Sequence, residues 1–563
     1  MNYEELKPFA ASDRQRELLD LLISEPSLSV YAAGKQLGMH KTHAYRSMRR
    51  LRAAAERASD VRTDLYCPRC AAEGLTEEAE RAESGRMRYK CGACGLITVR
   101  PAKVRPQILA DAPVKKCERF LITSAVNDTP IVSGAHKTFR ALARRVDAQY
   151  IIVPGVYKNP DLMHQGVIHG YTWPDEIHPY VCKTDVALNA NLMLQGSVRI
   201  AYTAINPLAG MNHAGNVRSE IYAHPQVAME MVATAKPMLP KMMHTTGTIS
   251  EPNYGDSRQA RKAAFHHSLS ALLVEVEGDR FWTTEVHYDG VGAQLFDQYH
   301  TPDACVTRPT AGIVYGDIHA RYLLEATHRN IHTLSTRLSG GYNVFHDVHD
   351  QHNGSHHTFG NTLFQLQANA AREFSIRDEL LLTARFLADK PNPAVVESNH
   401  HHHLIQWFNR FKPALDPVNV DLYFELGEMA RVDIAQGGDG NLLRLFLDCY
   451  CSNPDIRYVS CDEQFSIAGI DCSQHGDRGL SGTRGSAPGF AKSGHKTMVG
   501  HSHTPRIEKG CYQVGTSATG MPYARGFSSW FITHGLIYPS GKRALVSEID
   551  GDLSPLLRET LGL

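Results

Sequence analysis

The chain has 563 residues, of which 42% are hydrophobic and 21% are charged, close to ordinary globular usage. No apolar run reaches the roughly 18 to 20 residues that span a bilayer, and the start MNYEELKPFA does not resemble a secretory signal, so we expect no membrane partner and a cytoplasmic location. The formal net charge of +0 hides an asymmetry, because residues 1–116 carry 21 Lys and Arg against 15 Asp and Glu, and only this part should attract polyanions.

The length is too great for one hydrophobic core, so we predict a multidomain α/β protein. A symmetric homo-oligomer is the default expectation for such a protein. The predicted domains are a helix-turn-helix at 1–60, a zinc ribbon at 61–104, an α/β domain without a readable role at 117–305, and a catalytic domain at 306–563.

Residues 12–58 show helical periodicity on both sides of a short turn at Met39-His40, which is the pattern of a helix-turn-helix. The second helix is basic, and its early residues could enter a major groove of duplex DNA. The alternative is a small helical bundle with a solvated basic face. The candidate DNA contacts are Lys41, Thr42, His43, Arg46, Arg49 and Arg50.

Four of the 12 cysteines form two CxxC pairs, Cys67 with Cys70 and Cys91 with Cys94, separated by twenty residues. In a reducing compartment this pattern predicts a zinc ribbon rather than disulfides. Four thiolates complete a tetrahedral zinc ion and leave no position for a substrate, so the ion would be structural. The alternative is four unrelated free cysteines.

A linker precedes one βαβ unit: ERFLITSAVNDTPI reads as a strand, AHKTFRALARRV as a helix and AQYIIVPGVY as a second strand. The stretch up to about residue 305 has no phosphate loop, dinucleotide fingerprint or nucleophile elbow. His266 and His267 stand at the start of a strand, and we interpret them as structural rather than as ligands.

Five polar clusters then occur in order, each after a predicted strand: GDIH, DVHD, NHHHH, HGDRG and GHSHTP. Loops beyond the carboxyl ends of strands converge on one edge of an α/β sheet, so we expect a single site. The candidate ligands are Asp317, His319, Asp347, Asn399, His475, His501 and His503.

These ligands are too many for one ion, and they suit two divalent cations bridged by one carboxylate. Carboxylate with imidazole favours manganese, with iron, zinc or magnesium as the other choices. The alternatives are polar residues brought together by chance in a chain with 30 histidines, or an inactive site.

The pattern resembles the calcineurin-like metallophosphoesterase superfamily, whose signature is DxH, GDxxD, GNH, a lone His and GHxH, over about 190 residues of this chain. The resemblance implies an α/β-sandwich in which Asp317, His319 and His503 hold the first metal. It further implies that Asn399, His475 and His501 hold the second metal, with Asp347 as the bridge. His400 would be the catalytic histidine, oriented by the carboxylate of Asp350, and a dimetal-activated hydroxide would be the nucleophile.

The sequence departs from this signature at three positions. His346 stands where Gly usually precedes the bridging Asp, and Ser398 and His401 flank Asn399-His400 where Gly and an acid are usual. None of these changes removes a ligand. His346, His349, His352, His356 and His357 would contact phosphate or line the rim, and we favour the rim for most of them.

The ending GHSHTP is compatible with the nuclease branch, which includes SbcD-like enzymes, and the middle and catalytic regions resemble metallophosphoesterases that large bacteriophages encode, including the early host-DNA-degrading nuclease of T5-like phages. A basic helix-turn-helix and zinc ribbon in front of a diesterase site favour a DNase that binds DNA through its phosphates. The alternative is a DNA-binding regulator or DNA-transfer protein whose metal site hydrolyses small phosphoesters or nucleotides.

Overall fold

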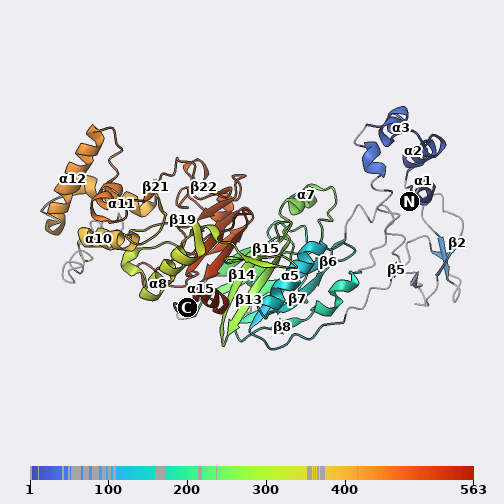
Figure 1. The fold of residues 1–563 in the computed structure, drawn as a ribbon, viewed down its shortest axis with the longest axis horizontal. Helices are drawn as coiled ribbons and strands as arrows, with labels where there is room; N and C mark the ends of the chain where they lie inside the picture. Colours follow the sequence, from blue (N-terminus) through green and yellow to red (C-terminus); the bar gives the residue numbers. More distant parts are fainter. Residues whose placement is uncertain are drawn as a thin grey trace. The chain divides into compact units, whose positions relative to one another are not determined.

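The computed structural model forms two compact units (Figure 1). The first comprises 1–109, 156–173 and 253–261, the second 110–155, 174–252 and 262–563, and the helix α7 (Arg258–Phe265) begins in one and ends in the other. The structure describes residues 3–10, 12–40, 43–48, 51, five short strands between 65 and 104, 110–158, 172–213, 218–235, 238–351, 375–414 and 416–563, with isolated positions between 355 and 367.

Short helices make up the described start of the first unit: α1 (Tyr3–Leu6), η1 (Lys7–Phe9), α2 (Asp13–Ser24), α3 (Val30–Gln36) and helical residues 43–48. Ser12 and Ser29 cap α2 and α3, and their hydroxyls accept from main-chain N–H groups at 3.3 and 3.2 Å. A Cβ on Gly34 would lie 2.5 Å from the Cβ of Ala44, so the glycine lets α3 approach the last helix closely. The helices enclose a small apolar core.

Five strands follow between residues 65 and 104: β1 (Leu65–Tyr66) pairs with β5 (Lys103–Val104), and β3 (Arg88–Cys91) pairs with β2 (Leu75–Glu78) and β4 (Ile97–Thr98), all antiparallel. Cys67, Cys70 and Cys94 lie outside the described residues, and for Cys91 only the main chain is described. The zinc ribbon and the helix-turn-helix both stay predictions.

The second unit contains the six-stranded sheet β21-β20-β19-β18-β27-β28. Strands β18 (Thr310–Val314), β19 (Ser339–Phe345), β20 (Pro393–Val396) and β21 (Arg457–Val459) are parallel, while β27 (Thr533–Ile537) and β28 (Arg543–Ser547) run antiparallel at one side. Their valine- and isoleucine-rich sequences suit strands buried on both faces. The parallel strands therefore end side by side at one edge.

A ten-stranded sheet in the order β22-β23-β24-β26-β25-β11-β12-β10-β9-β8 packs on the first sheet. Val314 and Val344 of one sheet share a buried cluster with Met498 and Ile507 of the other. Its strands are β8 (Asp185–Ala187), β9 (Leu192–Gln195), β10 (Ser219–Tyr222), β11 (Met229–Val232), β12 (Lys241–Thr245), β22 (Ser466–Ile467), β23 (Ile470–Asp471), β24 (Thr497–Val499), β25 (Arg506–Glu508) and β26 (Cys511–Gln513).

This sheet runs across the boundary expected at residue 306, because β11 pairs with β25 through Met229 and Ile507. The pairing gives each of these two strands a hydrogen-bonded neighbour on a side that would otherwise be the edge of a sheet. A chain-local pattern of strands and helices does not contain this long-range pairing.

The predicted βαβ unit is present: β6 (Arg119–Val126) and β7 (Gln149–Gly155) are parallel and joined by α5 (Ser133–Arg145). They lie in the four-stranded sheet β14-β13-β6-β7 with β13 (Ser270–Glu277) and β14 (Arg280–His287). A three-stranded sheet follows, made of β15 (Ala293–Leu295), β16 (Gln298–His300) and β17 (Cys305–Thr307).

In the second unit α5 lies against β6 and β7, whereas α10, α11 and α12 lie together on one side (Figure 1). Within the described ranges, no helix is both long and apolar enough to cross a membrane. The helices are α8 (Glu325–Thr333), α10 (Ile376–Leu387), α11 (Asn399–Arg410), α12 (Val420–Ala435), α13 (Leu442–Tyr450), α14 (Ala487–Phe490) and α15 (Pro555–Leu561), with shorter turns η2 (Asp175–Tyr180), η3 (Met211–His213), η4 (Ala320–Tyr322), η5 (Leu334–Leu338), η7 (Pro417–Asn419) and η8 (Leu480–Gly482).

Candidate metal centre

The seven candidate ligands follow the ends of strands in both large sheets. Asp317 and His319 follow β18, and Asp347 follows β19. Asn399 is the first residue of α11, directly beyond β20, where the Ser398 side chain caps the helix. His475 follows β23, and His501 and His503 follow β24. The adjacent ends of β18, β19 and β20 thus place three of the five clusters at one edge.

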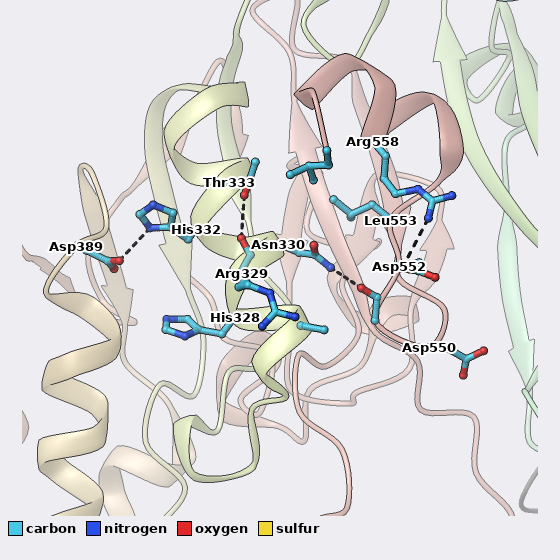
Figure 2. A pocket seen from close by; sticks show the side chains of 13 residues that line it. His328, Arg329, Asn330, His332, Thr333, Asp389, Asp550, Asp552, Leu553 and Arg558 are labelled. Atoms are coloured by element: carbon cyan, nitrogen blue, oxygen red, sulfur yellow. Dashed lines mark hydrogen bonds and ion pairs between the residues drawn. The ribbon is translucent and has the colours of Figure 1, made fainter.

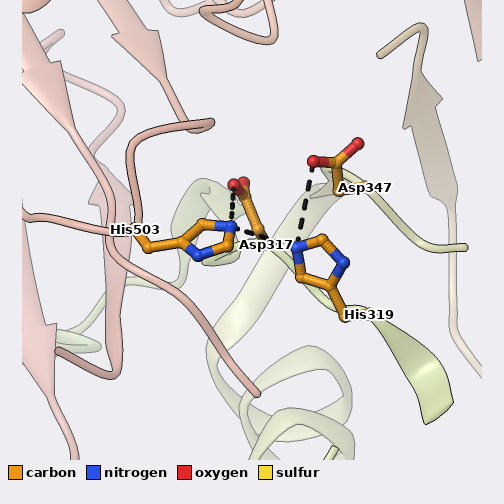
Figure 3. Close-up of side chains that lie close together, drawn as sticks. All are labelled: Asp317, His319, Asp347 and His503. Carbon is orange, nitrogen blue, oxygen red and sulfur yellow. Dashed lines mark hydrogen bonds and ion pairs between the residues drawn. The ribbon is translucent and has the colours of Figure 1, made fainter. Parts of the chain in front are cut away.

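The first group comprises Asp317, His319, Asp347 and His503, all buried, with one ligand atom each inside a mutual distance of 4.8 Å (Figure 3). His503 Nε2 lies 3.1 Å from Asp317 Oδ2 and 3.0 Å from His319 Nε2. His319 Nε2 is also 3.9 Å from Asp347 Oδ2. Two imidazole nitrogens and two carboxylates therefore point into the same small volume.

The second group shares Asp347 and adds His475 and His501. His475 Nε2 is 3.1 Å from Asp347 Oδ2. The amide oxygen of Asn399 lies 3.1 Å from His475 Nε2 and 3.1 Å from His501 Nδ1, so this side chain joins the same group. The structure thus brings all seven predicted ligands together, with Asp347 between the two groups.

The third group contains His319, Asp350 and His400. The ring of His400 pairs through Nδ1 with the main-chain carbonyl of Asp350, and the Asp350 carboxylate is farther from that nitrogen, at 3.8 Å. The carboxylate instead lies 2.9 Å from His319 Nδ1. Asp350 therefore orients both rings, through a carbonyl for His400 and through its carboxylate for His319.

The main chain at the site adopts an uncommon conformation. His319, Asp347, His501 and His503 all have positive φ, between 41° and 72°, although none is glycine. Such left-handed residues cost free energy and are concentrated at functional sites, where the surrounding fold holds them in place. Four of the seven ligands share this feature, which indicates that the fold is arranged to aim these side chains.

Burial and charge oppose each other at the carboxylates. Burial alone would raise the pKa of Asp347, but the His475 and His400 imidazoles outweigh it and hold that pKa well below its usual range. Burial likewise disfavours a charged His475, yet Asp347 and Asp317 together raise its pKa to about 9. Asp347 and His475 thus stabilise each other's charged form.

The donor set fits metal cations. Both oxygens of Asp347 and Oδ2 of Asp317 are buried and accept no well-aligned hydrogen bond from a described residue, and their nearest partners are imidazole nitrogens, at 3.1 Å from Asp347 Oδ2 and 3.1 Å from Asp317 Oδ2. Buried carboxylates and imidazoles that face one another in this way can bind a cation between them. His319, paired through Nδ1 with Asp350, keeps Nε2 available, which is the usual arrangement of a metal-binding histidine. These buried His and Asp residues can hold a metal ion.

Over 469 residues the chain is 30% identical to Protein A1 of Escherichia phage T5, and the alignment covers 78% of this chain and 83% of that protein. The chain belongs to the A1 family. This membership supports a bacteriophage origin. No family model and no solved structure matches the sequence.

The A1-family chain carries further histidines around the site. His346 is fully buried beside His475, with ring centroids 5.4 Å apart, and burial lowers its pKa to about 4. His349 is also fully buried, at 3.7 Å from Glu379, so neither residue lies at an exposed rim. His352, His356 and His357 are outside the described residues.

Sequence reasoning about this A1-family chain missed two residues at the site. A Cβ on Gly500 would lie 2.3 Å from Asp317 Oδ1, so only glycine lets the main chain pass the carboxylate. The Tyr523 hydroxyl donates a hydrogen bond of 2.8 Å to Asp350 Oδ1, although the two residues are 173 positions apart in the sequence. The GH pair at Gly500 was visible in the sequence, but nothing there marks Tyr523.

The predicted DNA contacts of the A1-family chain belong to the first compact unit. His43 and Arg46 are exposed on the helical residues 43–48. Lys41, Thr42, Arg49 and Arg50 lie outside the described residues. DNA binding by this unit stays a prediction.

A separate pocket lies between α8 and the segment before α15, and it offers no comparable cluster (Figure 2). His332 Nδ1 pairs with Asp389 at 2.9 Å, and Asn330 donates to the Gly551 carbonyl at 2.8 Å. Arg558 faces Asp552 at 3.7 Å. No group of three potential metal-ligand atoms lies among the described residues of this pocket, so the Asp347 cluster is the better candidate for chemistry in this A1-family chain.

Proposed function

We propose that this A1-family protein is a metal-dependent phosphodiesterase of the calcineurin-like superfamily that hydrolyses the DNA backbone. The observation that carries the proposal is the pair of ligand groups that share Asp347, with Asn399 and His475 on one side and Asp317 and His503 on the other. Two divalent cations held there would polarise the phosphate and activate the attacking water. Manganese is the metal that we propose first.

His400 is the residue that we propose to act on the leaving oxygen. Its side chain is 14% exposed, whereas Asp347 and Asp350 are almost fully buried, so a substrate can reach it. Nδ1 pairs with the Asp350 carbonyl, which leaves Nε2, at 3.9 Å from Asp347 Oδ2, on the side of the cluster. In that place Nε2 can donate a proton or a hydrogen bond to a phosphate ester oxygen.

The proposal that DNA is the substrate depends on the first compact unit. The predicted basic second helix of its helix-turn-helix and the predicted zinc ribbon, with one structural zinc, would bind duplex DNA through phosphates and bring the backbone to the metal centre. His43 and Arg46 are exposed on a helix, as a groove-contacting helix requires.

The first experiment incubates supercoiled plasmid with Mn²⁺ and the full-length protein, beside Asp347→Asn and His400→Ala. We expect cleavage by the wild type and a loss of about 100-fold or more in each variant. His332→Ala is the matched control, because His332 pairs with Asp389 away from the cluster, and it should cleave normally. Absence of metal-dependent plasmid cleavage, with hydrolysis of small phosphoesters retained, would favour the regulator or DNA-transfer alternative.

The second experiment removes residues 1–110. Under the proposal the shortened protein binds DNA more weakly and with a smaller dependence on salt, while it hydrolyses a small chromogenic diester at the same rate. If both activities are lost together, recruitment and catalysis do not divide between the units as proposed.

A further inference from the structure

An aromatic segment, residues 518–531, is hydrogen-bonded at three points to residues in or next to the metal centre. The main-chain N–H of Thr519 donates to the Tyr322 carbonyl at 3.2 Å, close to His319 in the chain. The Tyr523 hydroxyl donates to Asp350, and the N–H of Phe531 donates to the His503 carbonyl at 3.1 Å. The segment is therefore held next to Tyr322, Asp350 and His503.

The segment has four aromatic residues, of which Phe531 is buried and the other three are exposed to different degrees. Trp530 meets the His503 ring edge-on at a centroid distance of 4.3 Å, and Tyr523 lies 6.0 Å from Trp530. Phe527 is 75% exposed, and Arg525, two residues earlier in the chain, is exposed as well. An exposed aromatic ring and an exposed guanidinium can both contact a bound ligand.

Phe527 cannot be far from the cluster. It is three residues from Trp530, and three extended residues span at most about 11 Å. Because Trp530 contacts a ligand ring directly, Phe527 stands within reach of groups next to a phosphate bound at the metals. In a nucleic acid, those groups are the nucleosides on either side of the scissile bond.

We propose that Phe527 and Trp530 form a stacking platform for nucleobases next to the cleaved phosphate. The platform rests on the proposed function and specifies its substrate: a strand whose bases are accessible at the cleavage point, either single-stranded or opened from a duplex. Every base has an aromatic face, so the platform favours nucleic acid over small phosphoesters without selecting a sequence. The exposed Arg525 is suited to the adjoining phosphates.

The test measures kcat and KM on a single-stranded oligonucleotide for Phe527→Ala, Phe527→Leu and Phe527→Tyr. Stacking on one side chain predicts a KM about 10-fold higher in the Ala and Leu variants, a kcat within about 2-fold, and recovery of KM in the Tyr variant. Phe424→Ala is the matched control, because Phe424 is 64% exposed on α12. A normal KM in both the Ala and Leu variants would overturn the platform.

A second readout does not depend on cleavage. The full-length protein is photocrosslinked to an oligonucleotide that contains 5-iodouracil, and the attached residues are identified by mass spectrometry. We expect attachment at Phe527 or Trp530, and attachment confined to other residues would overturn the platform. Attachment at Phe527 in a protein that cleaves no DNA would support nucleic-acid stacking while it refuted the proposed nuclease.

Discussion

Replacement of Gly500 by alanine tests the geometry of the candidate metal centre most directly. Gly500 precedes His501 in the GHSH cluster, and its added Cβ would lie 2.3 Å from Asp317 Oδ1 and 3.3 Å from the His346 ring. The carboxylate must move by about 1.1 Å to reach the 3.4 Å of an ordinary contact. His346 is fully buried and blocks the other direction.

The expected effect follows from this displacement. A misplacement of about 1 Å at a reacting centre can cost about 100-fold in rate, and overpacking costs about 1–3 kcal/mol of stability. We therefore expect Gly500→Ala to lower the rate of Mn²⁺-dependent cleavage by about 100-fold and to weaken Mn²⁺ binding. Isothermal titration with Mn²⁺ and cleavage kinetics measure the two effects.

Gly427→Ala is the control, because a Cβ there meets only the Phe408 ring at 3.5 Å inside α12. This change at a half-buried helix position should keep full activity and add up to about 1 kcal/mol of stability. If Gly500→Ala binds Mn²⁺ and cleaves as the wild type does, the main chain does not press on Asp317 as described and the ligand geometry is refuted.

Two further predictions concern the metal centre, and a third concerns a buried histidine elsewhere. Chelation by EDTA should stop cleavage, and Asp347→Asn should bind fewer Mn²⁺ ions per chain than the wild type in a mass-spectrometric count, because Asp347 belongs to both ligand groups. Asp350→Asn should weaken metal binding about 10- to 100-fold in an Mn²⁺ titration, because the amide no longer offers His319 Nδ1 a negatively charged partner. Tyr523→Phe should weaken metal binding less, because the Asp350 carboxylate remains. Burial lowers the pKa of His224 to about 4, below the usual value of 6.5, so protonation of the unfolded chain lowers the free energy of unfolding as the pH falls from 6.5 towards 4. We expect the free energy of unfolding, measured in urea with EDTA present, to fall by about 2 kcal/mol less in His224→Gln than in the wild type between pH 7.5 and 5.

Much of the candidate site was predictable because its residues lie in short sequence motifs directly after predicted strands. A strand followed at once by GDIH, DVHD or GHSH places polar side chains at a strand end, and parallel neighbours bring strand ends together. All seven predicted ligands lie in one cluster in the structure, with Asp317 and His501 coming from different sheets. The roles of these residues as ligands and of His400 in catalysis stay predictions for the experiments above.

The sequence by itself determined which residue types supply the candidate site and how they are spaced, because hydrophobic periodicity and the position of a polar cluster after a strand can both be recognised in short stretches of chain. Only the tertiary structure decided which atoms face each other: that the Asp350 carboxylate meets His319 and its carbonyl meets His400, that Tyr523 reaches Asp350, and that β11 joins β25 across residue 306. These contacts join segments far apart in the chain. They depend on how buried sheets pack to exclude water, and that packing leaves no local pattern in the sequence.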